Sequence, residues 1–233
     1  MKKMRILGID SSAKSASAAY VKDETLVASY FQNSGLTHSK TLLPMIEDML
    51  KNNGIMADDI DMFAVSHGPG SFTGLRIGIS TVKGMAFSKN MPAVGVSTLE
   101  ATAYSAPQMD AVLCVVMDAR AGQVYAALFD LSEAFPVRIT KDRAVRIDDL
   151  KRELLEIEKP VYFAGDGVHL FDTAINIVPE NLRLPNAFGV CRLARRVYSA
   201  GGSEFSPADL KPEYLRLPQA ERERLAKIQG AAK

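Results

Sequence analysis

The feature that most constrains the fold is a pattern of strand, acidic turn and strand that occurs twice in the chain. The apolar run Met4–Ile9 leads into Asp10-Ser11-Ser12, and a second strand is predicted over Ala16–Val21. After Pro107 the pattern begins again, with an apolar run that ends in Asp118-Ala119-Arg120. Duplicated hairpins with acidic tips indicate two similar lobes that face one cleft.

The other predicted elements fit an α/β chain built from two such lobes. We expect lobes at residues 1–106 and 107–205, followed by an extended segment and charged tail at 206–233, with a charged helix over Gln219–Gln229. Periodicity predicts further strands at Thr25–Gln32, Ile60–Ser66, Ala93–Val96, Val112–Met117, Gln123–Leu131, Val137–Thr140 and Val161–Ala164. It predicts helices at Ser39–Lys51, Thr73–Lys89, Ile147–Ile157 and Ala187–Ser199, and a capping box of Ser97 and Glu100 that starts one more.

The composition of the 233 residues excludes several classes of protein. Hydrophobic residues make up 47% and charged residues 24%, as in ordinary globular proteins. A net charge of +1 argues against binding nucleic acid through a broad basic surface. No apolar run is long enough for a membrane span or signal peptide, so we expect a cytoplasmic protein with no membrane partner. Cys114 and Cys191 lie in apolar settings, which favours two buried thiols.

A glycine-rich loop, "SHGPGSFTGLRIG" at Ser66–Gly78, stands between a strand and a helix. That setting is shared by the two nucleotide-binding fingerprints, but neither pattern fits. A P-loop needs a lysine that is absent here, and Thr73 stands where the dinucleotide-binding pattern needs a glycine. The loop is therefore unusual, and these two fingerprints do not explain it.

Two helices carry more apolar surface than one contact requires. Along the helix Ser39–Lys51, one stripe is extended around the cylinder by further leucines, which indicates a second contact. Pro44 in this helix is tolerable only if it falls in the first turn. The stripe consists of Leu42, Met45, Ile46 and Met49.

The second of these helices repeats glycine at every fourth position, at Gly70, Gly74 and Gly78. Glycine inside a helix costs about 0.8–1 kcal/mol relative to alanine, so a close neighbour along this edge is expected. The neighbour is either a partner's helix or another part of the same chain, and the sequence leaves both open.

Other candidate sites also have a plain structural alternative. Asp10 and Asp118 either hold a metal–phosphate complex between the lobes or accept hydrogen bonds from their own turns. Gly165-Asp166-Gly167 either approaches an adenosine or forms an ordinary turn. A basic helix face either contacts a phosphate backbone or is solvated; it carries Arg192, Arg195 and Arg196.

Zinc and serine-hydrolase chemistry are not indicated. The histidines His38, His67 and His169 are scattered, without an H-x-x-x-H or H-E-x-x-H spacing, and no G-x-S-x-G elbow occurs. A metallopeptidase is therefore disfavoured. The alternative from another class is a self-sufficient ATP-dependent phosphotransferase, or a carbamoyl or acyl transferase, that uses Asp10 and Asp118 around magnesium.

Several phrases together resemble the bacterial TsaB (YeaZ) family. They are "ILGIDSSAKSASAAYV", "HSKTLLPMIEDML", "SHGPGSFTGLRIGIS", "VMDARAGQVYAALFD" and "KPEYLR", and the match runs from Ile6 to about Arg216. The resemblance implies the actin-like fold of sugar kinases and Hsp70, with two duplicated lobes. It also implies a dimerisation subunit of the complex that forms N6-threonylcarbamoyladenosine in tRNAs reading ANN codons, as a degenerate paralogue of the catalytic subunit TsaD.

The departures from TsaD agree with a non-catalytic subunit. TsaD carries an H-x-x-x-H metal pair where this chain has Thr98 and Thr102, and neutral hydroxyls are poor ligands for a transition metal. We therefore expect no catalytic residues, no metal and no cofactor on this chain alone, with ATP and magnesium acting in the full complex. The expected partners are TsaD and TsaE, with tRNA bound only through the complex and a homodimer forming when TsaD is absent.

The resemblance and the helix patterns together give two sets of site residues. The expected interface comprises His38, Leu42, Met45, Ile46, Met49, Gly70, Phe72, Thr73, Gly74, Leu75, Arg76 and Gly78. The expected vestigial nucleotide cleft comprises Asp10, Ser11, Ser12, Asp118, Arg120, Gly165, Asp166 and Gly167.

Overall fold

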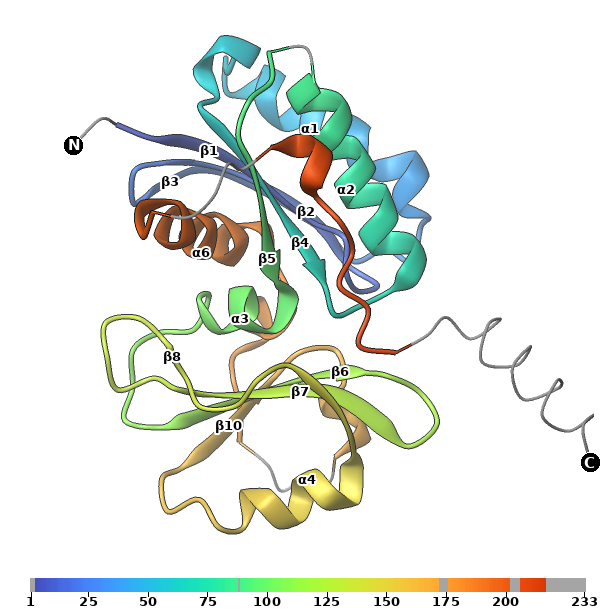
Figure 1. Cartoon of the computed structure of the whole chain (residues 1–233), viewed down its shortest axis with the longest axis vertical. Coiled ribbons are helices and arrows are strands. Elements are labelled where there is room, and N and C mark those ends of the chain that lie inside the picture. Colours follow the sequence, from blue (N-terminus) through green and yellow to red (C-terminus); the bar gives the residue numbers. More distant parts are fainter. Residues whose placement is uncertain (1–2, 88, 172–175, 202–205, 217–233) are drawn as a thin grey trace, which may run out of the picture.

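The computed structural model describes residues 3–87, 89–171, 176–201 and 206–216. The chain forms two lobes, each built around its own sheet, with helices on the faces (Figure 1). The helix predicted at Gln219–Gln229 lies outside the described residues.

The first lobe contains a five-stranded mixed sheet in the order β3-β2-β1-β4-β5. The first three strands form an antiparallel meander, and β1 pairs in parallel with β4, which pairs in parallel with β5. In this arrangement Asp10 lies at the end of the central strand β1, directly opposite Ser17. The strands are β1 (Arg5–Asp10), β2 (Ala16–Lys22), β3 (Thr25–Gln32), β4 (Met62–Gly68) and β5 (Ala93–Ser97).

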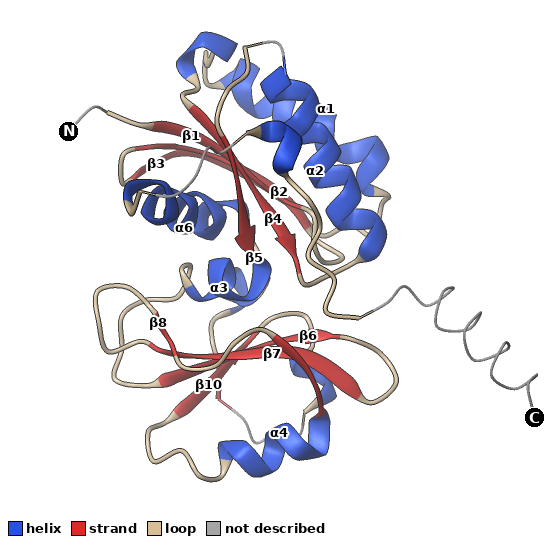
Figure 2. Ribbon diagram, in the orientation of Figure 1, coloured by secondary structure: helices blue, strands red, loops and turns tan. Residues whose placement is uncertain are grey.

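Helices cover both faces of the first sheet. The helices α1 (His38–Asn52) and α2 (Phe72–Phe87) lie on one face, and α6 (Ala187–Ser199) lies on the other (Figure 2). Because side chains alternate along a strand, β1 contributes Leu7 to the core under α1 and α2, and Ile6 to the core under α6. Both faces of this strand are therefore buried, which explains its continuous apolar sequence.

The second lobe contains a mixed sheet in the order β11-β10-β6-β7-β8, with β9 also paired to β7. One face packs under α4, where Leu150 is fully buried, and the other packs under α3, where Leu99 is fully buried. Its elements are β6 (Val112–Asp118), β7 (Gln123–Asp130), β8 (Val137–Arg138), β9 (Arg143–Arg146), α4 (Ile147–Leu154), β10 (Val161–Ala164), β11 (Asn176–Ile177) and α5 (Glu180–Arg183). The helix α3 (Thr98–Ala103) and the short 3-10 helices η1 (Ala57–Asp59), η2 (Val168–Leu170) and η3 (Pro207–Asp209) complete the fold.

The predicted α/β class, with duplicated lobes and mixed sheets flanked by helices, is confirmed. Both free cysteines are buried, as expected. The division of the chain at residues 106 and 205 stays a prediction. The packing of one helix was not expected. Although α6 follows the second sheet in the chain, it packs against β1 and β2 of the first lobe.

Two local predictions need correction. Pro44 falls beyond the first turn of α1, which begins at His38. The missing N–H would have met the carbonyl of Lys40, an exposed residue, so water can satisfy that carbonyl while the buried face of the helix keeps its packing. At α3, Ser97 caps the N–H of Glu100 as predicted, but the Glu100 carboxylate pairs with Arg138 rather than closing the box.

Candidate functional site

Asp10 is enclosed by hydrogen bonds from its own lobe. Its side chain is 1% exposed, and its carboxylate accepts from the Ser12 hydroxyl at 3.0 Å, the Ser12 N–H at 3.2 Å and the Ser66 hydroxyl. Burial raises the pKa of the Asp10 carboxyl above its ordinary value, against the lowering effect of these hydrogen bonds. Asp10 therefore follows the structural alternative, in which the acidic group organises its own turn.

The glycine edge of α2 packs against that same turn, so the close neighbour expected along it belongs to this chain. A Cβ on Gly74 would stand 2.1 Å from the carbonyl oxygen of Ser11, and the Ser11 hydroxyl donates to the carbonyl of Gly74 at 2.9 Å. Gly70 and Gly78 face Ser12 and Ser11 in the same way. The glycines admit the first hairpin of this chain, and no room remains there for a second helix.

Part of the expected interface is likewise the chain's own core. Leu42, Ile46, Met49 and Leu75 are at most 1% exposed and pack with the first sheet, so they cannot contact a partner. The wide apolar girth of α1 is explained largely by this burial. The expected residues that remain accessible are His38, Met45, Phe72, Thr73 and Arg76.

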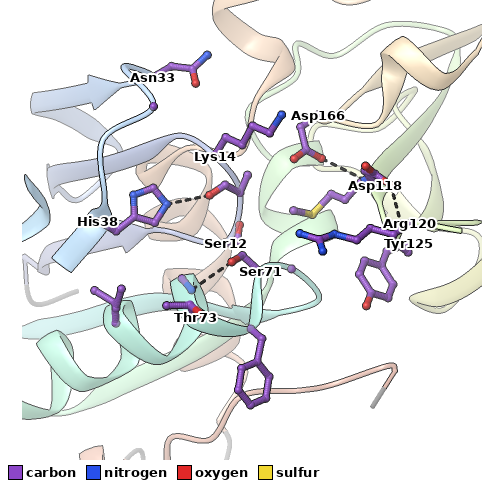
Figure 3. A pocket seen from close by; sticks show the side chains of 18 of the residues that line it. Ser12, Lys14, Asn33, His38, Ser71, Thr73, Asp118, Arg120, Tyr125 and Asp166 are labelled. Carbon is purple, nitrogen blue, oxygen red and sulfur yellow. Dashed lines mark hydrogen bonds between the residues drawn. The ribbon is translucent and has the colours of Figure 1, made fainter. Parts of the chain in front are cut away.

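A cavity of about 870 Å³ lies between the lobes. Figure 3 shows Ser12, Lys14 and His38 of the first lobe on one wall, opposite Asp118 and Arg120 of the second. His38 is held by a contact of 2.8 Å between its Nε2 and the carbonyl of Ala13. The duplicated turns thus face one cleft, as their repeated pattern predicted.

Asp118 and Asp166 meet on the second-lobe wall of the cavity. The Asp118 carboxylate accepts from the Arg120 N–H at 2.7 Å, and the Asp166 carboxylate accepts from the Asp118 N–H at 3.3 Å (Figure 3). Burial raises the pKa of Asp166 above its ordinary value. Gly165 has a φ of +101°, and with Gly167 it lies against the backbone of β6, so both glycines serve packing within the chain.

A shallower groove of about 510 Å³ runs over the outer face of α1 and α2. It is lined by residues of both helices, including Ser39, Leu43, Arg76, Ile77 and Ser80, and it shares part of its lining with the inter-lobe cavity. Leu43 remains 46% exposed there. The groove and the cavity share His38, Phe72, Thr73 and Ile77 in their linings, so they adjoin each other beside the first turn of α2.

The structure adds functional candidates that the sequence patterns missed. Lys14, Leu43, Tyr214 and Arg216 line the two hollows but were not expected as site residues. Tyr214 stacks on Phe72 with ring centroids 4.8 Å apart. The phrase "KPEYLR" carried part of the family resemblance, and that was the available signal for the last two.

The three arginines on the basic face of α6 contact other residues of the same chain. Arg196 stacks over Phe135 at 4.6 Å, and Arg192 donates to the carbonyl of Tyr104. Arg195 is near Asp23 and Glu24, with a shortest nitrogen–oxygen distance of 3.3 Å to Glu24. These contacts explain the arginines without a nucleic acid and leave little of a free basic patch.

The two threonines at the positions of the TsaD histidines are buried, at 0% and 1% exposure. The Thr102 hydroxyl donates to the carbonyl of Thr98 at 2.8 Å, as hydroxyls in helices often do. Among the described residues, no group of three or more histidine, cysteine, aspartate or glutamate side chains is placed to hold a metal ion.

Comparison with known proteins identifies relatives that match almost the whole chain. The chain is 30% identical to the tRNA threonylcarbamoyladenosine biosynthesis protein TsaB of Bacillus subtilis, over 94% of this chain and 96% of that protein. The TsaB of Haemophilus influenzae is also 30% identical, over 93% of this chain and 95% of that protein. The chain belongs to the TsaB family.

The wider comparisons extend this assignment to fold and ancestry. The solved structure of YeaZ from Pseudomonas aeruginosa superposes with a TM-score of 0.75 and 25% identity, covering 91% of this chain and all of that one. The TsaD family, described as tRNA N6-adenosine threonylcarbamoyltransferase, matches residues 32–200. This TsaB family member is therefore related to the TsaD family along most of its length.

Among the described residues, no helix combines the length and the apolar character that crossing a bilayer requires.

Proposed function

We propose that this chain is the non-catalytic partner subunit of a bacterial complex that forms N6-threonylcarbamoyladenosine in tRNA. In that complex it binds and activates TsaD, which acts on the adenosine 3' of the anticodon in tRNAs reading ANN codons. The observation that carries the proposal is the groove over α1 and α2, where apolar side chains stay accessible after the helices have packed on their own sheet.

The groove has the composition of a protein interface. Leu43 in its lining is 46% exposed, and Phe72 is half-buried, with the Arg76 guanidinium carbon 3.9 Å from its ring centroid. Aromatic and arginine side chains at the centre of an apolar patch are typical of residues that dominate binding energy. We propose that the same groove serves self-pairing when TsaD is absent, since a surface that receives a paralogous helix pair also suits a second copy.

The inter-lobe cavity supports a subunit without catalysis of its own. The Ser12 and Ser66 hydroxyls donate to the Asp10 carboxylate, which does not line the cavity. The alternative enzyme would need this carboxylate to hold magnesium. We therefore assign no cofactor to this chain alone, and place ATP and magnesium in the full complex with TsaD and TsaE.

Transfer RNA is proposed to bind only through the assembled complex, in the cytoplasm. The net charge of +1 gives little long-range attraction to phosphates. The arginines of α6 are engaged with aromatic rings, acidic side chains and a backbone carbonyl, so they offer few donors to a phosphate backbone.

Reconstitution with TsaD and TsaE from the same organism tests this function. Threonylcarbamoyladenosine should form in tRNA when this chain, TsaD, TsaE, ATP, magnesium and the threonylcarbamoyl donor are present, and it should fall to background when this chain is omitted. The isolated chain should not turn over ATP. Steady ATP turnover by the isolated chain, lost on Asp10→Ala, would instead support the self-sufficient transferase.

A further inference from the structure

The extended segment Lys211–Arg216 crosses from the first lobe to the second at the mouth of the inter-lobe cavity (Figure 1). We propose that this segment is a clasp, which holds the two lobes at a fixed spacing and thereby sets the opening of the cavity. The proposal does not depend on the identity of the partner.

The clasp is anchored to the first lobe by its backbone. The Glu213 N–H donates to the carbonyl of His67 at 2.7 Å, and the Glu213 carboxylate lies 3.3 Å from the His67 Nε2. The Glu213 carbonyl occupies the place where a Cβ on Gly68 would stand, and Gly68 has a φ of +136°. Only glycine allows the segment to lie this close to the end of β4.

A second anchor uses side chains at the start of α2. Tyr214 stacks on Phe72, and the Arg76 Nε donates to the Tyr214 hydroxyl at 2.9 Å. Arg76 also covers the other ring, with its guanidinium carbon 3.9 Å from the Phe72 centroid. Stacked rings under a guanidinium fix the direction in which the chain continues to Arg216.

Arg216 makes the crossing to the second lobe. Its Nη1 donates to the carbonyl of Ala119 at 2.6 Å and lies 3.3 Å from the carbonyl of Arg120. These carbonyls belong to the turn between β6 and β7, where Arg120 and Ala121 have positive φ values of 62° and 53°. The Arg120 carbonyl also accepts from the Gln123 N–H within the turn, at 3.2 Å, and its second lone pair can accept a donor from outside.

The lobes are already joined elsewhere, at α3. There Arg138 of β8 donates to the Glu100 carboxylate at 2.6 Å, and α3 packs against both α6 and β6. In Figure 1 this junction and the clasp lie on opposite sides of the gap between the sheets. The tip of the first hairpin also meets the second lobe, where Ala13 packs in the core cluster that contains Val115 and Met117. Two lobes can hinge about such junctions, and an attachment across the opening restricts that motion.

Distances between spin labels on the two lobes test the clasp. The labels are carried by Glu47→Cys on α1 and Glu156→Cys after α4, both at exposed positions, while Cys114 and Cys191 are buried. In the unaltered clasp the inter-label distance distribution should be narrow. Arg216→Ala, combined with Tyr214→Ala, should broaden the distribution or shift it to longer distances. Arg216→Lys should have a smaller effect, because its ammonium can still donate to a carbonyl although it lacks the forked guanidinium.

Lys211→Ala is the matched control, because Lys211 is an exposed residue of the same segment. It should leave the distribution unchanged. Each variant is first checked for the near-ultraviolet circular dichroism of the parent, and if the double variant is unfolded, Arg216→Ala alone is used. An unchanged distribution in folded Arg216→Ala would overturn the clasp, as would equal broadening in Lys211→Ala.

Discussion

A Cβ on Gly74 would stand 2.1 Å from the carbonyl oxygen of Ser11, so the first turn of α2 and the first hairpin are packed backbone to backbone. This contact, which joins residues far apart in the sequence, explains why glycine recurs along one edge of the helix. The side of α2 that faces the hairpin is therefore filled by this chain, and the proposed partner surface lies on the outward side of α1 and α2.

Gly74→Ala should destabilise the isolated chain by about 1–3 kcal/mol, since the methyl group overpacks a contact whose neighbour is backbone. Gly84→Ala is the matched control in the same helix, because a Cβ there meets nothing within 4 Å. It should stabilise the chain by about 0.5–1 kcal/mol through helix propensity. Urea unfolding of both variants measures the difference, and equal effects at the two positions would contradict this packing.

The hairpin contact also shows what the sequence could and could not provide. Local patterns predicted Thr25–Gln32, Val161–Ala164 and Ala187–Ser199 with the observed bounds, because alternation and helical periodicity are properties of neighbouring residues. They did not reveal that α6 packs on the first sheet, or that Ser11 lies against Gly74 and Gly78 of α2. Those contacts depend on how distant segments are brought together, and the short strands β9 and β11 are set by such pairing alone.

The candidate site also combines residues that local patterns predicted with contacts between distant segments that they did not. Asp118 and Arg120 of the second repeated turn line the cavity, as that pattern predicted, and Asp166 of the separate Gly165-Asp166-Gly167 turn lines it beside them. Asp10 does not line the cavity, because Ser66 of a different strand encloses its carboxylate. Nothing in the spacing around Asp10 distinguishes an enclosed carboxylate from an open one.

The folding stability of Asp10→Asn should rise relative to that of the parent as pH rises from about 4 to 7. Burial raises the folded-state pKa of Asp10, so the folded parent binds its proton more readily than the unfolded chain does. That contribution to stability is present at low pH and is lost as pH rises through the folded pKa. Melting temperatures of the two proteins across this range measure the trend, and a melting temperature of Asp10→Asn that falls relative to the parent's as pH rises would rule it out.

His67 should make the chain less stable at mildly acidic pH. Burial lowers the pKa of His67 below its ordinary value, so the unfolded chain takes up the proton first as pH falls. Its contribution is present above the unfolded pKa of about 6.5 and is lost as pH falls through the folded pKa. The parent should therefore lose more melting temperature between pH 7.5 and 5 than His67→Gln does. His169→Gln, at an exposed histidine, should retain the parent's loss; a parent that matches His67→Gln would refute this prediction.

Neither cysteine should react with a thiol reagent in the native chain. Cys114 and Cys191 are fully buried, and burial raises the pKa of both thiols, which suppresses the reactive thiolate. Two thiols per chain should be titrated after denaturation in guanidinium without reductant. Rapid labelling before denaturation, or fewer than two thiols afterwards, would contradict the buried free thiols.

The central claim is that the outward groove of α1 and α2 receives TsaD, and the most direct test is the mass of the mixture by light scattering. Leu43→Arg places a charge in the groove, whereas Leu155→Arg places the same charge at an 85% exposed leucine of the second lobe. With TsaD from the same organism, Leu43→Arg should weaken pairing at least tenfold, about 1.4 kcal/mol, with an unchanged melting temperature. Leu155→Arg should pair normally. Full pairing by folded Leu43→Arg, or equal loss in both variants, would contradict the account.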